Sequence, residues 1–465
     1  MRSFSHNLDR VKVVFDDDRL VADAGLILPA TLAARLGLRE LFDRHVDLGS
    51  VAGAANVGRK ALTVIHSVLA GGDSIDDCDA LRAGSTAAVL GHAVAAPSTV
   101  GTFLRAFSWG HARQIDRVAA AVLARAWAAG IGPGDRPMTI DVDSSIIETY
   151  GLQKQGGSRF TYSHVRGYHP LFATVAATGD VVHSRLRGGP ANSARGAAGF
   201  LTETFRRVRA AGATGPLCAR ADSGFYNQSV VRACTNAGVT FSITAKMTKK
   251  LRALIEGIDA AEWAPIPYFL DDGADVAEVA YQAFPHAKGG PGIDCRLIVR
   301  RVRPTPGSQL ALFTTWSYHA FITDRAGTTT FLEADHRRHA VVENAIRDLK
   351  YGVGLNHLPS GRFGANAAWL GLNVIAHNMS RWSARLGGID TRPPTHTDID
   401  IETGAFKPAR KSFVATDTLR RRYLRTPGRI TRSGRRTTLH LPADWPWAEH
   451  FHQMLTNLRS VNLTI

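Results

Sequence analysis

The chain of 465 residues contains only four cysteines, and these are far apart in the sequence. Cys78, Cys218, Cys234 and Cys295 form no Cys-x-x-Cys pair. Thiolate zinc sites and the disulfide frameworks of small secreted domains both depend on closely patterned cysteines. We therefore expect reduced, mostly packed thiols and neither kind of cross-link.

Long hydrophobic runs are also missing from the sequence. A membrane-spanning helix needs about 18 or more consecutive apolar residues, and no such stretch occurs. The first residues carry scattered charges that end in Asp16, Asp17 and Asp18, without the apolar segment of a signal peptide. A membrane is therefore excluded as the leading partner, and we expect a cytoplasmic protein.

Acidic residues are in deficit relative to basic ones. Lys and Arg number 56 against 40 Asp and Glu, which gives a formal charge of +16. A surplus of this size indicates a polyanionic partner, and nucleic acid is the commonest one. A solvated basic surface without a partner is the alternative.

The positive charge is concentrated near the carboxyl end. Residues 404–465 contain twelve Lys and Arg against three Asp and Glu. Several of these basic residues surround a hairpin-like segment at 429–439, which predicts an arm that grips DNA phosphates. The arginines that we assign to DNA binding here are Arg420, Arg421, Arg422, Arg432, Arg435 and Arg436.

The pattern of apolar, Gly and Pro residues changes along the chain. Helical patterns fill residues 18–130, and a Gly- and Pro-rich stretch at 130–137 ends them. Strand and helix patterns then alternate, which predicts an α/β plan with a mixed sheet. The expected organisation is a helical DNA-binding domain at 1–130, a catalytic core at 138–245 and 331–386, a β-rich insertion at 246–330 and a basic DNA-binding region at 387–465.

Two predicted strands carry acidic residues where apolar ones are expected. Alternation within 138–145 places Asp141 and Asp143 on one face of a strand, and Asp222 ends the strand at 217–221. Burying an unpaired carboxylate costs on the order of several kcal/mol, so these groups must face a cation or polar partners. The alternatives are a capped strand end for Asp143 and a turn or helix cap for Asp222.

A predicted helix at 336–351 carries Glu343 and Lys350. The two residues are seven apart, so they lie two turns along one helix face, and a carboxylate and an amine can reach the same substrate. The alternative is an exposed helix in which Glu343 only pairs with Arg347 at i,i+4.

Taken in chain order, Asp143, Asp222 and Glu343 with Lys350 resemble the Asp-Asp-Glu (DDE) transposases of bacterial insertion sequences. The resemblance extends over nearly the whole chain. The segments that carry it most specifically are 141–145 with 150–151, 167–171, 220–225, 343–350 and 363–366. Residues 69–73 with Asp76 and Asp77, and residues 97–99, also resemble the helical domain of that family.

This resemblance implies a ribonuclease-H-like mixed-sheet core with an inserted β-rich subdomain, preceded by a helical domain and followed by a basic tail. It also implies a DNA transposase that cuts the ends of its element and joins them to target DNA. Asp143, Asp222 and Glu343 would hold two Mg²⁺ or Mn²⁺ ions for phosphoryl transfer, with Asp141 as the competitor for the first ligand position. Lys350 would contact DNA phosphate, and the expected partners are the terminal inverted repeats, target DNA and a second copy of the chain in the DNA complex.

The helix before Glu343 departs from the family pattern. His336, His339 and Ala340 stand where the family usually has Tyr, Arg and Gly. Arg337 or Arg338 could compensate for the missing arginine, and we assign both, together with His339 and Arg347, to DNA binding. His336, His339 and Glu343 also have a spacing that could bind zinc in a hydrolase. Two further classes of protein fit the same residues: a metal-dependent nuclease without strand transfer, and an inactive, transposase-derived DNA-binding protein.

Overall fold

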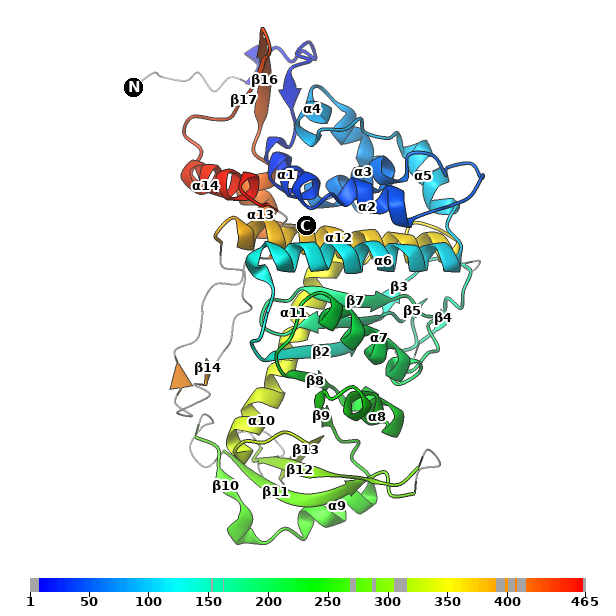
Figure 1. Ribbon diagram of the computed structural model, residues 1–465, viewed down its shortest axis with the longest axis vertical. Helices are drawn as coiled ribbons and strands as arrows, with labels where there is room; N and C mark the ends of the chain where they lie inside the picture. Colours follow the sequence, from blue (N-terminus) through cyan, green and yellow to red (C-terminus); the bar gives the residue numbers. More distant parts are fainter. Residues whose placement is uncertain are drawn as a thin grey trace.

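The computed structural model describes residues 8–151, 154–161, 163–267, 273–286, 290–304, 316–389, 398–399, 406–407 and 415–462. The described parts stack along one long axis (Figure 1). Amino-terminal helices and a small hairpin lie at one end, two long helices cross the middle, and a mixed sheet continues from there to the other end.

The amino-terminal layer is helical, as the sequence predicts. Its helices are α1 (Ile27–Arg35), α2 (Leu38–His45), α3 (Val57–Ala70), α4 (Thr86–Leu90), α5 (Pro97–Arg105) and α6 (Trp109–Ala126). The apolar pattern at 29–42 predicts one helix, but the structure has two. Gly37 has a left-handed φ of +59°, which ends α1 and starts α2 at a new angle.

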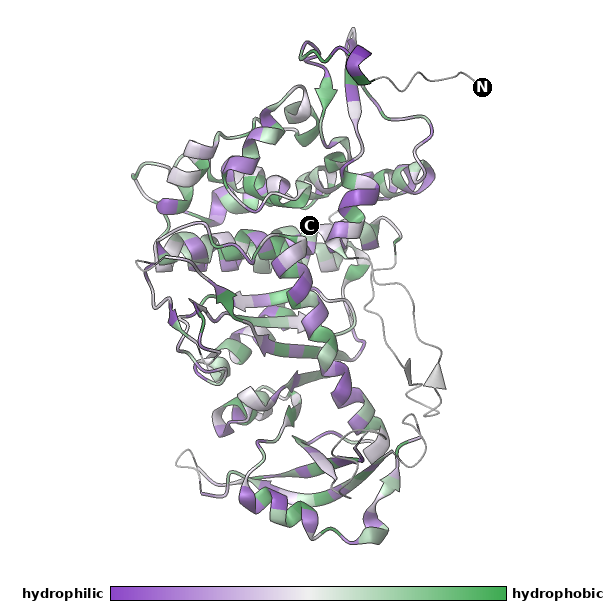
Figure 2. Ribbon diagram, turned by 180° about the vertical axis from the view of Figure 1, so that it is seen from behind, coloured by the Kyte–Doolittle hydropathy of each residue, from purple (hydrophilic) through white to green (hydrophobic). Residues whose placement is uncertain are grey.

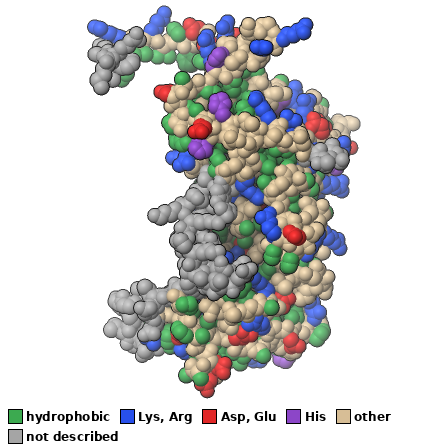
Figure 3. Space-filling model, turned by 60° about the vertical axis from the view of Figure 1, so that its left-hand side comes forward, with side chains coloured by type: hydrophobic (Ala, Val, Ile, Leu, Met, Phe, Trp, Pro, Cys, Tyr) green, Lys and Arg blue, Asp and Glu red, His purple; other side chains and the backbone are tan. Residues whose placement is uncertain are grey.

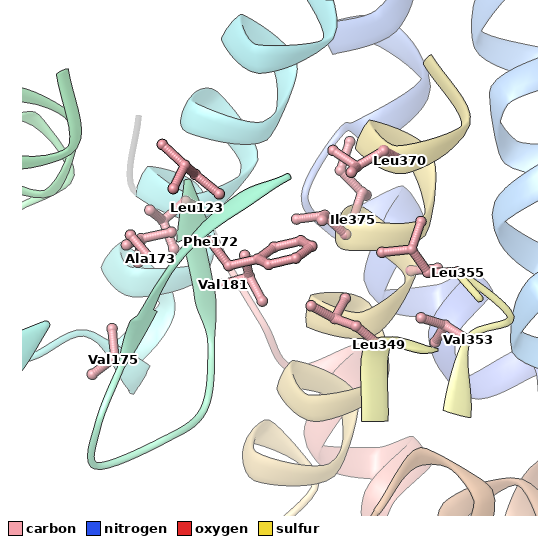
Figure 4. Packing of buried hydrophobic residues seen from close by; sticks show 14 of the residues in the cluster. Leu123, Phe172, Ala173, Val175, Val181, Leu349, Val353, Leu355, Leu370 and Ile375 are labelled. Carbon is pink, nitrogen blue, oxygen red and sulfur yellow. The ribbon is translucent and has the colours of Figure 1, made fainter. Parts of the chain in front are cut away.

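Helix α12 (Phe363–Leu386) joins the helical layer to the sheet. It packs on α3 and α6 and against the sheet, and most of its side chains are buried. Figure 4 shows Leu370 and Ile375 of this helix beside Phe172 and Val181 of the sheet and Leu123 of α6. One cluster of buried apolar side chains thus runs from the amino-terminal helices into the sheet, and the two parts share a core. Figure 2 shows hydrophobic and hydrophilic residues along these helices from the opposite side.

The central sheet has nine strands in the order β10-β11-β12-β13-β9-β8-β2-β6-β7. Strand β2 is parallel to β8, β8 is parallel to β9, and the other pairs are antiparallel. The strands are β2 (Met138–Ser144), β6 (Leu171–Val175), β7 (Val181–Arg185), β8 (Leu217–Ala221), β9 (Thr240–Thr244), β10 (Ala264–Pro265), β11 (Ala274–Ala283), β12 (Ile293–Val302) and β13 (Ser317–Thr323). Strands β3 (Ile147–Glu148), β4 (Arg159–Phe160) and β5 (Arg166–Tyr168) form a small separate sheet, and α7 (Ala197–Ala210) and α8 (Gln228–Asn236) connect core strands.

The β-rich region between β9 and residue 329 is part of the same sheet. Its strand β13 pairs with β9, so the long β11–β12 ladder extends the core sheet edge to edge. This region also contains a helix, α9 (Lys249–Glu256), that the sequence pattern did not predict. A second expected strand at 309–315 lies outside the described residues.

The carboxyl-terminal residues fold over the amino-terminal helices. Strands β16 (Gly428–Ser433) and β17 (Arg436–His440) form the hairpin expected at 429–439, and β16 also pairs with β1 (Leu20–Val21). Helix α14 (Ala448–Arg459) packs on α1, and α13 (Thr416–Leu419) packs on α12. The basic region is therefore tied to the first helical layer through both a sheet and a helix contact.

The remaining expectations concern membranes and cysteines. Among the described residues, no helix has the length and apolar character needed to cross a bilayer. All four cysteines are free, three of them buried and Cys295 half-buried, so the expectation of unpaired, packed thiols is confirmed.

Candidate active site

Asp143 and Asp222 lie at the ends of two neighbouring parallel strands. The β2–β8 register pairs Asp141 with Arg220 and Val142 with Ala221, so the next residue of each strand is one of these two aspartates. Asp143 accepts a hydrogen bond from the Ser144 backbone amide at 2.6 Å. Asp222 accepts one from the Gly224 amide at 3.0 Å and caps the short turn that follows. The two carboxylates therefore sit at one edge of the sheet, where parallel strands end.

Glu343 reaches the same place from a helical segment that is irregular. The expected helix at 336–351 is divided into α10 (Thr329–Arg337), η8 (Arg338–Val341), α11 (Val342–Arg347) and the π-type turn η9 (Asp348–Gly352). Glu343 is exposed in the first turn of α11, and α11 contacts β2. Arg347 donates to Asn344 at 2.8 Å rather than pairing with Glu343.

Electrostatics couple the three carboxylates. Burial raises the pKa of Asp143 to about 6, and the charges of Asp222 and Glu343 push it in the same direction. His339 and the Ser144 amide oppose this rise without cancelling it. The charges of Asp222 and Glu343 thus add to an effect whose main cause is burial.

The donor chemistry of this site suits a divalent cation, because Mg²⁺ and Mn²⁺ prefer carboxylate oxygens. The raised pKa of Asp143 reflects mainly its burial, and a cation bound beside the carboxylate would offset that cost. Among the described residues, however, no group of three or more His, Cys, Asp or Glu side chains is gathered closely enough to form a complete metal-binding set. The structure thus places Asp143 and Asp222 at neighbouring strand ends and Glu343 on α11, which contacts β2, without gathering the three carboxylates around one point.

Asp141, two residues before Asp143, has a different environment. It is completely buried, and Arg220 donates to both of its oxygens, Nε to Oδ1 at 2.6 Å and Nη2 to Oδ2 at 2.9 Å. His339 Nδ1 lies 3.0 Å from Oδ1. Burial alone would raise the pKa of Asp141, but Arg220 and then His339 hold it below its usual value. Both oxygens are thus already engaged by cationic or hydrogen-bonding partners.

Arg220 was not assigned a role from the sequence. It is buried in β8 and also donates to the backbone oxygen of Asp335 at the end of α10. The sequence contains an indication of this role, because Arg220 lies inside the apolar strand 217–221. A buried arginine must have a counter-charge, and the neighbouring strand contains a buried aspartate. Register between the two strands, which only the fold supplies, identifies that partner as Asp141.

The zinc interpretation of the His336, His339 and Glu343 spacing is wrong. His336 Nδ1 is 2.8 Å from Ser242 Oγ and its Nε2 is 2.9 Å from Thr244 Oγ1, so both ring nitrogens are used. The ring stacks on Phe321 with centroids 4.1 Å apart. Burial lowers the pKa of His336 well below its usual value, which leaves the imidazole neutral inside the sheet–helix contact.

Lys350 lies beside the acidic site. Its Nζ donates to the Ile146 backbone oxygen at 2.8 Å, three residues after Asp143. Burial lowers the pKa of Lys350, and the charge of Asp143 partly restores it. Lys350 is therefore close enough to Asp143 to interact with its charge, and its contact with DNA stays a prediction.

The other basic residues of this helical segment lie near buried or half-buried carboxylates of the core. Arg337 Nε is 3.8 Å from Glu333, and Arg338 Nη1 is 3.9 Å from Asp335. His339 is only 13% exposed and faces Asp141. At the position where the family has arginine, this histidine therefore contacts a buried carboxylate of the core, and its assignment to DNA is untested.

The carboxyl-terminal arginines fall into two groups. Arg420 is buried, and its guanidinium donates to the backbone oxygens of Val68, Leu69 and Gly352, which places it in the packing between α3 and the catalytic segment. Arg421 is exposed and 3.1 Å from Asp417, and Arg422 lies over the Trp447 ring. The hairpin arginines assigned to DNA binding, Arg432, Arg435 and Arg436, are exposed. Figure 3 shows Lys and Arg side chains at the end of the molecule where this hairpin projects.

Comparison with known protein families identifies the class of protein. The model of the family described as transposase DDE domain group 1 matches residues 5–392, and the chain belongs to this family. A solved structure of the piggyBac transposase in a synaptic complex with hairpin DNA aligns with a TM-score of 0.43 at 10% identity, over 79% of this chain and 76% of that one. No curated protein sequence matches this chain significantly.

Proposed function

We propose that this protein is the DNA transposase of an insertion sequence, which cuts the ends of its element and joins them to target DNA. The observation that supports the proposal is the position of Asp143 and Asp222 at the ends of neighbouring parallel strands, with Glu343 on α11, which contacts β2, and Lys350 near Asp143. The family membership of the chain supports the same activity. The net charge of +16 supports DNA as the partner.

In this proposal the central strands form a ribonuclease-H-like core. The order β7-β6-β2-β8-β9, an antiparallel meander followed by two parallel strands, supports it. The inserted strands β10 to β13 extend this core on one side. The helical layer and the β16–β17 hairpin would bind the element's ends within a homodimer, as the family resemblance implies.

Asp143, Asp222 and Glu343 would hold Mg²⁺ or Mn²⁺, which supplies activation of the attacking oxygen and stabilisation of the leaving oxygen. Asp143 is a better candidate for the first ligand than Asp141, because Arg220 and His339 already occupy the oxygens of Asp141. Lys350 would place a DNA phosphate next to the carboxylates. The structural role of the Asp141–Arg220 pair is to hold β2 and β8 in the register that sets Asp143 beside Asp222.

The test is excision and joining of a DNA segment that carries the sequences flanking the gene, with Mg²⁺ or Mn²⁺. We expect the unmodified protein to cut and join, and Glu343→Gln to do neither while still binding the DNA. Glu262→Gln, which changes an exposed carboxylate in the inserted region, is the matched control and should behave like the unmodified protein.

The remaining outcomes distinguish a transposase from the two rival classes. Cutting without joining would identify a metal-dependent nuclease. Binding without any cutting, by the unmodified protein as well as by Glu343→Gln, would identify an inactive descendant. Failure of the unmodified protein to bind DNA at all would contradict the proposal.

A further inference from the structure

A cleft of about 480 Å³ opens where the helical layer meets the core. Its walls include Arg105, Trp109, Gln155, Arg362 and Phe363. None of the described residues that line it is acidic. The size falls within the range of ligand pockets, and the combination of two guanidinium groups with two aromatic rings is unusual for an unused surface.

The two arginines keep most of their donors available. Arg362 Nη1 donates to the Arg105 backbone oxygen at 3.1 Å, and Arg105 Nη2 makes a long contact of 3.4 Å with Thr102 Oγ1. Both side chains are exposed, and neither forms an ion pair within the described part of the chain. A phosphate in the cleft would find two cations without competing carboxylates.

Trp109 supplies an exposed ring beside these cations. The side chain is 46% exposed, although it is large and apolar, and its ring lies 5.4 Å from that of Phe363 at a tilt of 39°. An exposed indole next to guanidinium groups can stack on a base whose phosphate the arginines hold. Bases inside a duplex are already stacked and paired, so only an unpaired base can offer its face to Trp109.

The frame of the cleft is fixed by close packing between the starts of α6 and α12. A Cβ atom at Gly364 would lie 2.1 Å from the Phe107 backbone oxygen, so only glycine allows this approach. The first turn of α12 carries no side-chain cap, which leaves its backbone amides available at the cleft. Phe363 and Gly364 belong to the segment 363–366 that carries part of the family resemblance.

Two chain segments lead from the acidic site to the cleft. Lys350 donates to the Ile146 oxygen, and further along the same two segments Lys154 Nζ donates to the Leu358 oxygen at 2.7 Å. The Gln155 amide then donates to the Gly361 oxygen at 2.8 Å, at the rim of the cleft. These contacts join the segments that follow Asp143 and Lys350 to the rim of the cleft.

We infer that this cleft binds an unpaired nucleotide of the DNA strand held at the acidic site, with the phosphate on Arg105 and Arg362 and the base stacked on Trp109. The inference rests on the proposed function and adds to it a preference for DNA that is single-stranded beside the point of cutting. The cleft is then a second contact on the substrate, separate from the carboxylates and from the carboxyl-terminal hairpin.

The test compares the binding of a fluorescein-labelled oligothymidine and of a blunt duplex of the same length, in the Glu343→Gln background so that nothing is cut. We expect Trp109→Ala and the double variant Arg105→Ala/Arg362→Ala each to weaken oligothymidine binding by about 5- to 100-fold. Duplex binding should change by less than about 3-fold, because the hairpin and other surfaces still hold the backbone. Trp109→Phe should retain most of the affinity, since it keeps a stacking face.

Arg252→Ala is the matched control for loss of one exposed arginine and should leave both affinities unchanged. Thermal unfolding of each variant verifies that the fold is intact. Equal loss of duplex and oligothymidine binding would contradict the unpaired-base inference, as would unchanged binding in all cleft variants. If ATP binds in a Trp109-dependent way and the oligothymidine does not, the cleft takes a free nucleotide and the inference is wrong. Absence of any DNA binding by the unmodified protein would instead overturn the proposed function itself.

Discussion

Asp141 and Asp143 are two residues apart on one strand, yet they differ in how far neighbouring cations offset the cost of burying the carboxylate. Asp141 is paired with Arg220 and His339, and its pKa is held low. Asp143 faces Asp222 and Glu343, and its pKa is raised to about 6. A buried carboxylate with its counter-charges stabilises the native packing, whereas a cluster of carboxylates without them costs stability and is available for a cation. The comparison separates the structural carboxylate from the candidate catalytic one.

The largest expected effect is on activity. Asp143→Asn removes a candidate metal ligand, so we expect cutting to fall by about 10³-fold or more, equivalent to ~4 kcal/mol. Cutting of labelled DNA in single-turnover conditions measures this effect. Asp79→Asn, on an exposed aspartate of the helical layer, is the control and should retain activity. Full activity of Asp143→Asn would assign the first ligand position elsewhere.

The next effect concerns the stability of the charged pair. Arg220→Ala leaves Asp141 buried beside a single histidine, and we expect the free energy of unfolding to fall by about 3 to 5 kcal/mol. Urea unfolding followed by circular dichroism measures the loss. The double variant Arg220→Met/Asp141→Leu removes both charges and should recover much of it. A fall of less than about 1 kcal/mol for Arg220→Ala would show that the pair does not hold the two strands.

Removing a charge from the carboxylate cluster should instead raise the free energy of unfolding. The pKa of Asp143 is higher in the folded protein, so the folded state binds its proton more tightly than the unfolded chain does. The stabilising contribution of that proton is complete below about pH 4 and is lost as the pH rises through about 6. Asp143→Asn should therefore be more stable than the unmodified protein by about 1 to 3 kcal/mol at pH 7, with little difference at pH 4.

Urea unfolding of both proteins across this pH range tests the prediction. Added Mg²⁺ should raise the stability of the unmodified protein at pH 7 more than that of Asp143→Asn, because a bound cation stabilises the folded state. A difference that does not depend on pH would mean that the pKa of Asp143 is not raised in the folded protein.

The smallest effect concerns the hairpin. Replacing Arg432, Arg435 and Arg436 with Ala removes three exposed cations, and we expect duplex DNA affinity to fall by about 10-fold at physiological salt. The slope of log affinity against log salt should decrease by about 2 to 3. Fluorescence anisotropy at several salt concentrations measures both. Arg420→Ala should instead lower stability, because its buried guanidinium holds backbone oxygens rather than phosphate. An unchanged salt slope would exclude the hairpin from the DNA interface.

Much of the local structure was predictable from the sequence. The strand at 217–221, the hairpin strands on either side of residue 178 and the long helix that ends at Leu386 all follow from apolar patterning and turn residues. The helix at 336–351 was predicted as continuous, but it contains 3₁₀ and π turns. The π turn begins at Asp348, which accepts hydrogen bonds from Thr416, and that contact joins residues 68 positions apart.

The sequence by itself determined the charge balance, the order of helical and strand-rich parts and the candidates Asp143, Asp222 and Glu343, because composition, periodicity and motif are local properties of the chain. The tertiary structure alone decided which charges are matched. Strand register makes Arg220 the partner of Asp141. His336 is a neutral core residue whose ring nitrogens contact Ser242 and Thr244. The buried guanidinium of Arg420 donates to backbone oxygens rather than to phosphate. A charge acquires its role from its neighbours in space, and for these residues the neighbours are dozens to hundreds of positions away in the chain.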